Sequence, residues 1–266
     1  MARVGLLTCY AGLMASVAAP NFSLALSLRS AAGIFQENRL SSTLYVSTEK
    51  TPPTAEDKTN ECLTIINTLR TENFNGLLTA LATADDGEVT ASLDKIQKKT
   101  LESPTAKKIA EALAGDDATT CDLAASANAE TYPGLVIPFA YNTTFDCKAL
   151  IRATYEAGLS HLRESSFDPS TDTYNVTLAP FNNVAASNTA FLLSSKSAKV
   201  SCAATKNCEA GQNVLFCYFI DPLQTGDAPF TTEVYNALWG VGKGAASILV
   251  PSVSTALLSL ALTILT

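Results

Sequence analysis

Residues 199–220 read KVSCAATKNCEAGQNVLFCYFI, and this stretch decides the fold. Its second half, Val214–Ile220, is dense in aromatic and β-branched residues and predicts a central strand, which Asp221-Pro222 ends. The apolar run Lys199–Ala203 predicts a neighbouring strand. Because these strands follow each other closely in sequence with a short connection, we expect them to pair antiparallel.

Upstream of these strands, apolar residues recur with the spacing of helices. A helix is predicted to start at Thr54, with Asp57 in a loose capping box, and to end near residues 73–76. Its apolar side would be formed by Cys62, Ile65, Ile66 and Leu69. Another helix starts after Ser103-Pro104 and ends at Gly115. The clearest helix is capped by Asp146, and its apolar side comprises Cys147, Leu150, Ile151, Tyr155, Gly158, Leu159 and Leu162.

Other segments carry weaker patterns. Residues 77–85 predict a helical start that Asp85-Asp86-Gly87 closes, and 89–99 predict a short helix. Prolines within 132–141 favour an edge strand or an extended loop. Tyr174, Val176 and Leu178 alternate as in a half-buried strand, and Ala190–Leu193 is a further apolar run. Helices that precede strands in this order predict an α+β fold.

The N-terminus has the features of a secretory signal. Arg3 supplies a positive residue, and Val4–Val17 is apolar or small throughout. Ser16-Val17-Ala18 offers small residues at the positions that a signal peptidase reads. Cleavage after Ala18 is favoured, because a cut one residue later would leave Pro20 first. Residues 1–18 are therefore predicted to be a signal peptide.

The C-terminal stretch, Ile248–Thr266, contains no charged residue. Small residues precede it: Gly240, Gly242, Gly244, Ala245, Ala246 and Ser247. Small residues followed by an apolar tail are the signal for a glycosylphosphatidylinositol (GPI) anchor, in which lipid replaces the tail. Residues 241–266 are predicted to be removed, with attachment near Gly240, Gly242, Gly244 or Ala245. The rival interpretation is a spanning tail, which needs about 20 apolar residues and normally a flanking Lys or Arg.

Between the two processed ends, residues 19–240 are predicted to form one ectodomain, which is long enough for a single well-filled core. The formal net charge of −7 excludes a nucleic-acid partner, since an acidic chain repels phosphates. Three sequons, at Asn21, Asn142 and Asn175, are candidate N-glycosylation sites that would have to be exposed.

Six cysteines remain once Cys9 is lost with the signal: Cys62, Cys121, Cys147, Cys202, Cys208 and Cys217. An even number in an exported chain predicts three disulfides, although spacing alone does not choose among the pairings. The rival interpretation, a zinc site, lacks a Cys-x-x-Cys pair and has a single histidine, His161. We expect no metal and no cofactor.

The sequence offers little for catalysis. His161 lies on a predicted helix, away from its apolar side, and no Gly-x-Ser-x-Gly motif nominates a serine. Asp85-Asp86 and Asp116-Asp117 are interpreted as turn and cap residues rather than as metal ligands. Trp239 belongs either to an aromatic recognition patch or to a stalk before the anchor. We expect no enzyme, with a hydrolase that depends on His161 as the outside alternative.

The signal peptide, the six spaced cysteines, the ending VSC-x5-C-x8-CYF of residues 200–219 and the anchor signal resemble the surface antigens (SAG) of Eimeria, a coccidian parasite. The resemblance covers nearly all of the chain. That family is similar in architecture to the CAP superfamily of cysteine-rich secretory and pathogenesis-related proteins. The resemblance implies a three-layer α-β-α sandwich with a central antiparallel sheet. It also implies the CAP pairing Cys62–Cys202, Cys121–Cys147 and Cys208–Cys217.

Many CAP proteins hold a metal with two histidines and two acids, a set that one histidine cannot supply. The resemblance therefore implies a scaffold without an active site. The expected function is a non-enzymatic antigen, GPI-anchored at the extracellular face of the plasma membrane, that attaches to host cells or interacts with host immunity. Its partner would be a host cell-surface protein or glycan. The alternative is a secreted CAP-type module that binds lipid or sterol, which predicts an apolar cavity.

Overall fold

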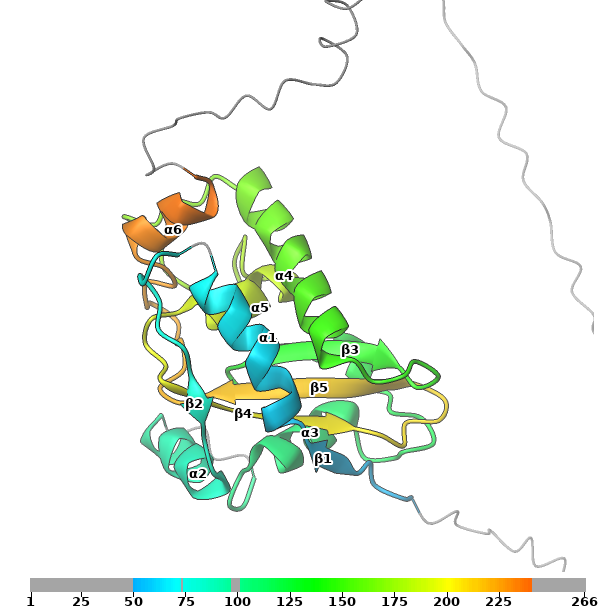
Figure 1. Ribbon diagram of the computed structural model, residues 1–266. Coiled ribbons are helices and arrows are strands. Elements are labelled where there is room, and N and C mark those ends of the chain that lie inside the picture. Colours follow the sequence, from blue (N-terminus) through cyan, green and yellow to red (C-terminus); the bar gives the residue numbers. More distant parts are fainter. Residues whose placement is uncertain (1–49, 73, 97–100, 241–266) are drawn as a thin grey trace, which may run out of the picture. The chain divides into compact units, whose positions relative to one another are not determined.

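The computed structural model describes residues 50–72, 74–96 and 101–240 (Figure 1). In chain order the elements are β1 (Ala55–Asp57), α1 (Thr59–Thr71), β2 (Ala82–Thr83), α2 (Asp86–Lys95), α3 (Ala106–Ala114), the 3₁₀ turn η1 (Ala124–Ser126), β3 (Leu135–Ala140), α4 (Cys147–Glu164), α5 (Val184–Leu193), β4 (Lys199–Thr205), β5 (Gln212–Phe219) and α6 (Thr232–Leu238). The predicted signal peptide, residues 1–18, and the predicted anchor signal, residues 241–266, lie outside the described residues. Within those described ranges, no helix combines the length and the apolar composition that crossing a membrane requires.

The sheet is built around the hairpin that residues 199–220 predict. Its strand order is β1-β4-β5-β3, and the short β2 pairs with β4 in parallel. The three other pairings are antiparallel, and β5 lies inside the sheet between β4 and β3. The predictions of a central strand and of antiparallel pairing are therefore confirmed. The proline-flanked β3 is an edge strand, as its prolines indicate.

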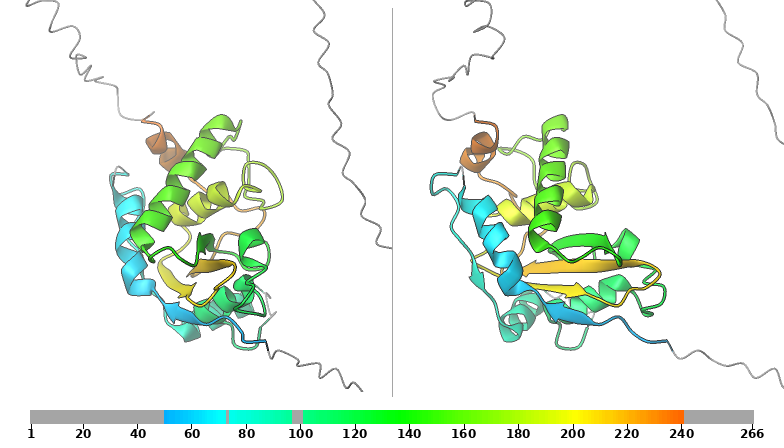
Figure 2. Two further views of the ribbon diagram at one scale, coloured as in Figure 1. Left: turned by 90° about the vertical axis from the view of Figure 1, so that its right-hand side faces the viewer. Right: turned by 45° about the vertical axis from the view of Figure 1, so that its right-hand side comes forward.

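Helices lie against both faces of the sheet, as Figures 1 and 2 show. One face packs against α1, α4 and α5 in a core rich in phenylalanine and tyrosine, which we call the aromatic side. The other packs against α2, α3 and η1 in a core rich in alanine, which we call the alanine side. Alternate residues of β5 supply the two cores: Leu215, Cys217 and Phe219 the first, and Val214, Phe216 and Tyr218 the second.

The mixed composition of helices and an antiparallel sheet confirms the α+β prediction. Further likeness to the CAP architecture stays a prediction. Several helix starts are confirmed as well, because they depend on local hydrogen bonds. Asp146 Oδ1 accepts a hydrogen bond from the Ala149 amide at the start of α4. Gly115, with φ of 117°, ends α3 in a conformation that glycine adopts readily.

The first predicted helix starts later than expected. Residues 55–57 form β1, which pairs with the end of β4, and α1 begins only at Thr59. Asp57 is the last residue of β1, and its Oδ1 accepts from the Thr59 amide at the start of α1, so this residue precedes the helix instead of lying within it. Pairing with a distant strand thus takes the segment that a local pattern assigns to the helix.

Three weaker predictions are wrong. Residues 77–85 are not helical: they contain β2, and Asp85 starts α2 through a capping box with Glu88. Residues 174–178 form turns rather than a strand, with Tyr174 buried and Leu178 60% exposed. The run Ala190–Leu193 lies in α5, which is buried on all sides and so lacks the one-sided period of a surface helix.

Two close contacts fix α5 within the aromatic side. The Asn188 side chain accepts from the Val136 amide and donates to the Val136 carbonyl, both at 2.8 Å, so it pairs with the outer edge of β3. Gly158 of α4 crosses α5 so closely that a β-carbon there would lie 2.1 Å from Thr189 Oγ1 and 2.3 Å from the Ala185 carbonyl oxygen. The crossing at Gly158 therefore leaves no room for a side chain.

Candidate functional site

The six predicted cysteines form three disulfides, so the prediction of their number is confirmed. The bridges are Cys62–Cys147, Cys121–Cys208 and Cys202–Cys217, with sequence separations of 85, 87 and 15. The first joins α1 to the start of α4, the second joins two loops on the alanine side, and the third joins β4 to β5. All six residues are at most 2% exposed.

The pairing implied by the CAP resemblance, Cys62–Cys202, Cys121–Cys147 and Cys208–Cys217, is wrong at each bridge. The reason is the sheet that separates the two cores. Cys121 and Cys208 lie in the alanine side, whereas the other four lie in the aromatic side. Cys121–Cys147 and Cys208–Cys217 would each have to pass through the sheet. Cys202 and Cys217 are instead direct partners in the β4–β5 register, with Cα atoms 4.0 Å apart.

The sulfurs of Cys62, Cys202 and Cys217 lie within 4.8 Å of one another. Two bridges therefore touch inside the aromatic side. A metal needs free thiolates, and each of these three sulfurs is already bonded to another. This cluster is a structural cross-link and offers no metal ligand.

The candidate catalytic residues do not come together. His161 is exposed, and its Nε2 lies 2.9 Å from Asn183 Nδ2, the side chain that caps α5. Asp85 caps α2, as expected of a cap residue. Asp117 Oδ1 accepts from the amide and hydroxyl of Thr119, and these hydrogen bonds lower the pKa of Asp117. Asp117 is thus a turn residue, and each of these polar groups completes local backbone structure.

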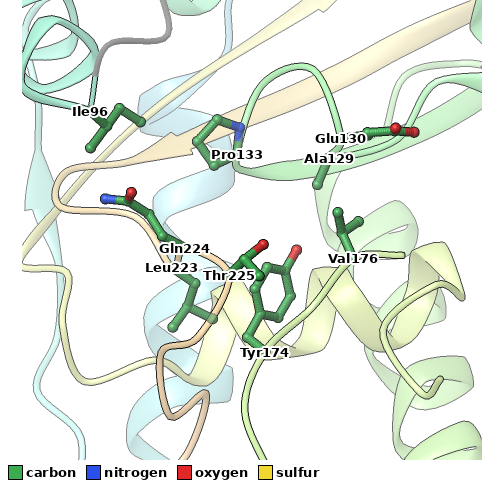
Figure 3. Close-up of a pocket in the computed structure, with 9 residues that line it drawn as sticks. All are labelled: Ile96, Ala129, Glu130, Pro133, Tyr174, Val176, Leu223, Gln224 and Thr225. Carbon is green, nitrogen blue, oxygen red and sulfur yellow. The ribbon is translucent and has the colours of Figure 1, made fainter. Parts of the chain in front are cut away.

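A small hollow lies between the segment that precedes β3, the segment around Tyr174 and Val176, and the chain that follows β5 (Figure 3). Tyr174, Val176, Leu223 and Pro133 give it mostly apolar walls, and its volume is about 210 Å³. A neighbouring hollow of about 170 Å³ shares Val176 as a wall. Drug-sized ligands occupy roughly 300–1,000 Å³, so neither hollow has the volume that a sterol requires.

Two of the predicted glycosylation sites are described. Asn142 is exposed in the turn after β3. Asn175 is half-buried, and its Oδ1 accepts from the Thr177 amide at 3.0 Å and hydroxyl at 2.8 Å. Asn21 lies outside the described residues. Of the predicted attachment residues, Gly240 is exposed just beyond α6, and Gly242, Gly244 and Ala245 lie outside.

Trp239 is packed against the folded domain rather than held out on a stalk. Its ring makes an edge contact with Tyr235 at 5.8 Å, and the Arg163 guanidinium of α4 lies 4.9 Å from its centre. The Tyr235 hydroxyl donates to the Phe167 carbonyl at 3.3 Å. Arg163, Tyr235 and Trp239 line an open hollow, which we call the Trp239 hollow.

One buried residue has no counterpart in the sequence analysis. Arg70 is fully buried on α1, and it donates to the carbonyl oxygens of Thr79, Leu192 and Ser194 at 2.8–3.0 Å. Burial lowers the pKa of Arg70 to about 10. Two of its acceptors lie at the end of α5, where unpaired carbonyls favour a cation. The apolar neighbours of Arg70 at positions 65, 66 and 69 were a signal that it faces the core.

The two helical layers, the antiparallel sheet and the buried bridges define a disulfide-stabilised α+β domain of the kind found outside cells. Among solved structures, this chain is similar to the crystal structure of the Eimeria tenella surface antigen protein SAG19, with 62% identity and a TM-score of 0.69. The match covers 72% of this chain and 99% of that one. The chain belongs to the Eimeria surface antigen (SAG) family. No protein-family model and no curated protein matches it.

Proposed function

We propose that this protein is a non-enzymatic surface antigen, held by a GPI anchor at the extracellular face of the parasite plasma membrane, that contacts a host cell-surface protein or glycan. One observation carries the proposal: 62% identity to a surface antigen over 99% of its length. The bridges support it, because disulfides persist in oxidising compartments. The small residues around 240–247 and the uncharged run after them support the anchor.

The arrangement of the domain gives this proposal an orientation. The described chain ends beyond α6, next to the aromatic-side helices, whereas α2 and α3 lie on the opposite side of the sheet (Figure 1). With an anchor attached shortly after α6, the alanine side would face away from the membrane. Leu123, next to η1 on that side, is 52% exposed. An exposed apolar side chain at such a position is a suitable anchor point for a partner.

The first experiment tests the anchor. Parasites are treated with a phospholipase specific for phosphatidylinositol, and the supernatant is probed for the protein. Release supports the proposed anchor, and mass spectrometry of the released chain gives its first residue and its attachment residue. A protein that stays on the cell and keeps residues 248–266 contradicts the anchor and favours a spanning tail.

The second experiment tests the host-facing side. Soluble protein that ends at Ala245 is bound to host cells as wild type, Leu123→Asp and Leu77→Asp. Leu77 is the matched control, since it is 43% exposed and follows α1 on the other side of the sheet. We expect Leu123→Asp to weaken binding about tenfold, the loss of one good contact. Equal binding by all three proteins would contradict this orientation.

The alternative is a secreted CAP-type carrier of lipid or sterol. The hollow in Figure 3, at about 210 Å³, is by itself too small for a sterol. The same soluble protein would have to bind a fluorescent sterol saturably for this alternative to replace the antigen proposal. A hydrolase would require an activity that His161→Ala abolishes.

A further inference from the structure

We propose that the Trp239 hollow binds the head group of the protein's own anchor, the phosphoethanolamine and first sugars that connect the polypeptide to lipid. This inference rests on the proposed GPI attachment and adds a binding site for it. The hollow is lined by Arg163, Tyr235 and Trp239, which come from the C-terminal end of α4 and from α6 with the residue after it.

The first argument is that the hollow lies close to the predicted attachment residues along the chain. Trp239 immediately precedes Gly240, and the four predicted attachment residues lie between 240 and 245. An extended chain spans at most about 3.6 Å per residue, so the attachment carbonyl lies within roughly 20 Å of Trp239 even at the farthest candidate. The anchor's phosphate is therefore tethered beside the hollow.

The second argument is that the three lining side chains suit a phosphate and sugars. Arg163 is exposed, so its guanidinium keeps N–H groups free for a phosphate while its face covers the Trp239 ring. No carboxylate of the described residues forms an ion pair with Arg163; the adjacent Glu164 accepts from the Ser160 hydroxyl instead. The half-buried rings of Tyr235 and Trp239 offer apolar surface to the faces of sugars.

The third argument is that the core holds the Tyr235 wall of the hollow in place. Tyr235 contacts the rings of Phe167 and Phe230, at 5.6 and 6.0 Å, and these belong to the core of the aromatic side. Val234 of α6 is 1% exposed in the same core. The Tyr235 wall of the hollow is therefore held in place by the core, which lowers the entropic cost of binding there.

Tethering makes weak binding sufficient. A ligand linked through a few residues has an effective concentration on the order of 1 mM. An intrinsic dissociation constant near 1 mM, about 4 kcal/mol of binding free energy, then gives roughly half occupancy. One charged hydrogen bond together with one aromatic contact supplies a free energy of this order.

The only tryptophan of the chain reports on this site directly. We compare acrylamide quenching of its fluorescence in two forms: the native protein released by phospholipase, which keeps the anchor glycan, and a secreted form that ends at Ala245. Each is made as wild type, Arg163→Ala and Lys148→Ala. Lys148 is the matched control, an exposed cation at the other end of α4.

We expect the quenching constant of the glycan-bearing wild type to be about twofold lower than that of the secreted form, since half occupancy shields half of the indoles. Arg163→Ala should remove the difference, and Lys148→Ala should keep it. Equal constants for the two wild-type forms, in a protein whose mass proves the anchor present, would overturn this inference alone. A released protein without anchor mass would overturn the proposed function and this inference with it.

Discussion

The two faces of the sheet are packed by different kinds of side chain. In the described residues, the aromatic side buries eight phenylalanine and tyrosine side chains, together with two touching bridges and one buried cation. The alanine side brings α2 and α3 close to the strands with small residues and a single bridge. The aromatic side therefore holds the touching bridges and the buried cation, whereas small residues and one bridge pack the alanine side.

The largest expected effect comes from removing one long bridge on each side. Cys62→Ala/Cys147→Ala opens the aromatic side, and Cys121→Ala/Cys208→Ala opens the alanine side. Their sequence separations, 85 and 87, are nearly equal. The loop-entropy model therefore predicts the same loss, about 4.5 kcal/mol each. Denaturant unfolding measures both, and losses that differ by more than about 2 kcal/mol would show that local packing, not loop closure, sets their value.

The buried cation distinguishes the two sides next. Arg70 is the only charged residue that is buried in the described part of the chain. Arg70→Ala leaves the carbonyls of Thr79, Leu192 and Ser194 without their donor and opens a cavity, so we expect a loss of about 4 kcal/mol. The exposed Arg152→Ala on α4 is the control and should change stability by less than about 0.5 kcal/mol. A loss below about 1 kcal/mol for Arg70→Ala would mean that these carbonyls find other partners.

Adding one methyl group tests how tightly α4 and α5 cross on the aromatic side. Gly158→Ala places a β-carbon against Thr189 and Ala185 of α5, which should cost about 3 kcal/mol. Gly87→Ala, at an exposed position in the first turn of α2, is the control, since the nearest atom to its β-carbon is Asp85 Oδ1 of the same turn at 3.2 Å. There we expect a change within about 1 kcal/mol, because helix propensity offsets the contact. Thermal melting of both variants checks this, and equal shifts would remove the contrast.

The smallest effect is the response to alkaline pH, to which tyrosines on both sides of the sheet contribute, among them Tyr174 and Tyr218. Tyr174 bonds to Ser187 on the aromatic side, and Tyr218 bonds to Ser92 on the alanine side. Burial raises the pKa of each hydroxyl from 10.0 to about 12. Because the folded state holds these protons more tightly than the unfolded state, their contribution is complete below pH 10 and is lost as the pH rises to about 12.

Each tyrosine should contribute on the order of 2 kcal/mol to that loss. Unfolding free energies measured across this pH range, with tyrosinate absorbance followed in parallel, provide the test. Tyr174→Phe and Tyr218→Phe should each flatten the profile by a similar amount. A profile that stays flat in the wild type would contradict the burial of both hydroxyls.

The features that sequence predicted are those determined by neighbours along the chain. Asp146 caps α4 because its acceptor and the donor are three residues apart, and Val214–Ile220 forms a strand because its own side chains favour one. The bridges joining Cys62 to Cys147 and Cys121 to Cys208 depend on which face of the sheet each cysteine reaches, which no local pattern records. The spacing of the cysteines does not select one pairing, and the pairing implied by the CAP resemblance differs from the observed one at every bridge.

The candidate site was less predictable than the fold. The sequence singles out Trp239 as an aromatic candidate. Its partner Arg163 lies in α4, far from Trp239 along the chain, and only the packing of the fold brings the two side chains together. The helix α5 is not predicted from sequence because it is buried on every side. Such a helix lacks the alternation of apolar and polar residues by which a surface helix is recognised. Arg70 was hidden because a cation at an apolar position normally indicates a solvated side chain.

The closed edge of the sheet has a consequence for contacts between copies of this molecule. Asn188 occupies the outward backbone groups of Val136, and Pro138, which points its backbone to the same side two residues on, has no amide hydrogen to give. A neighbouring copy therefore finds no free strand there on which to extend a shared sheet. Copies that met along this border would therefore lack the backbone groups needed to join their sheets edge to edge.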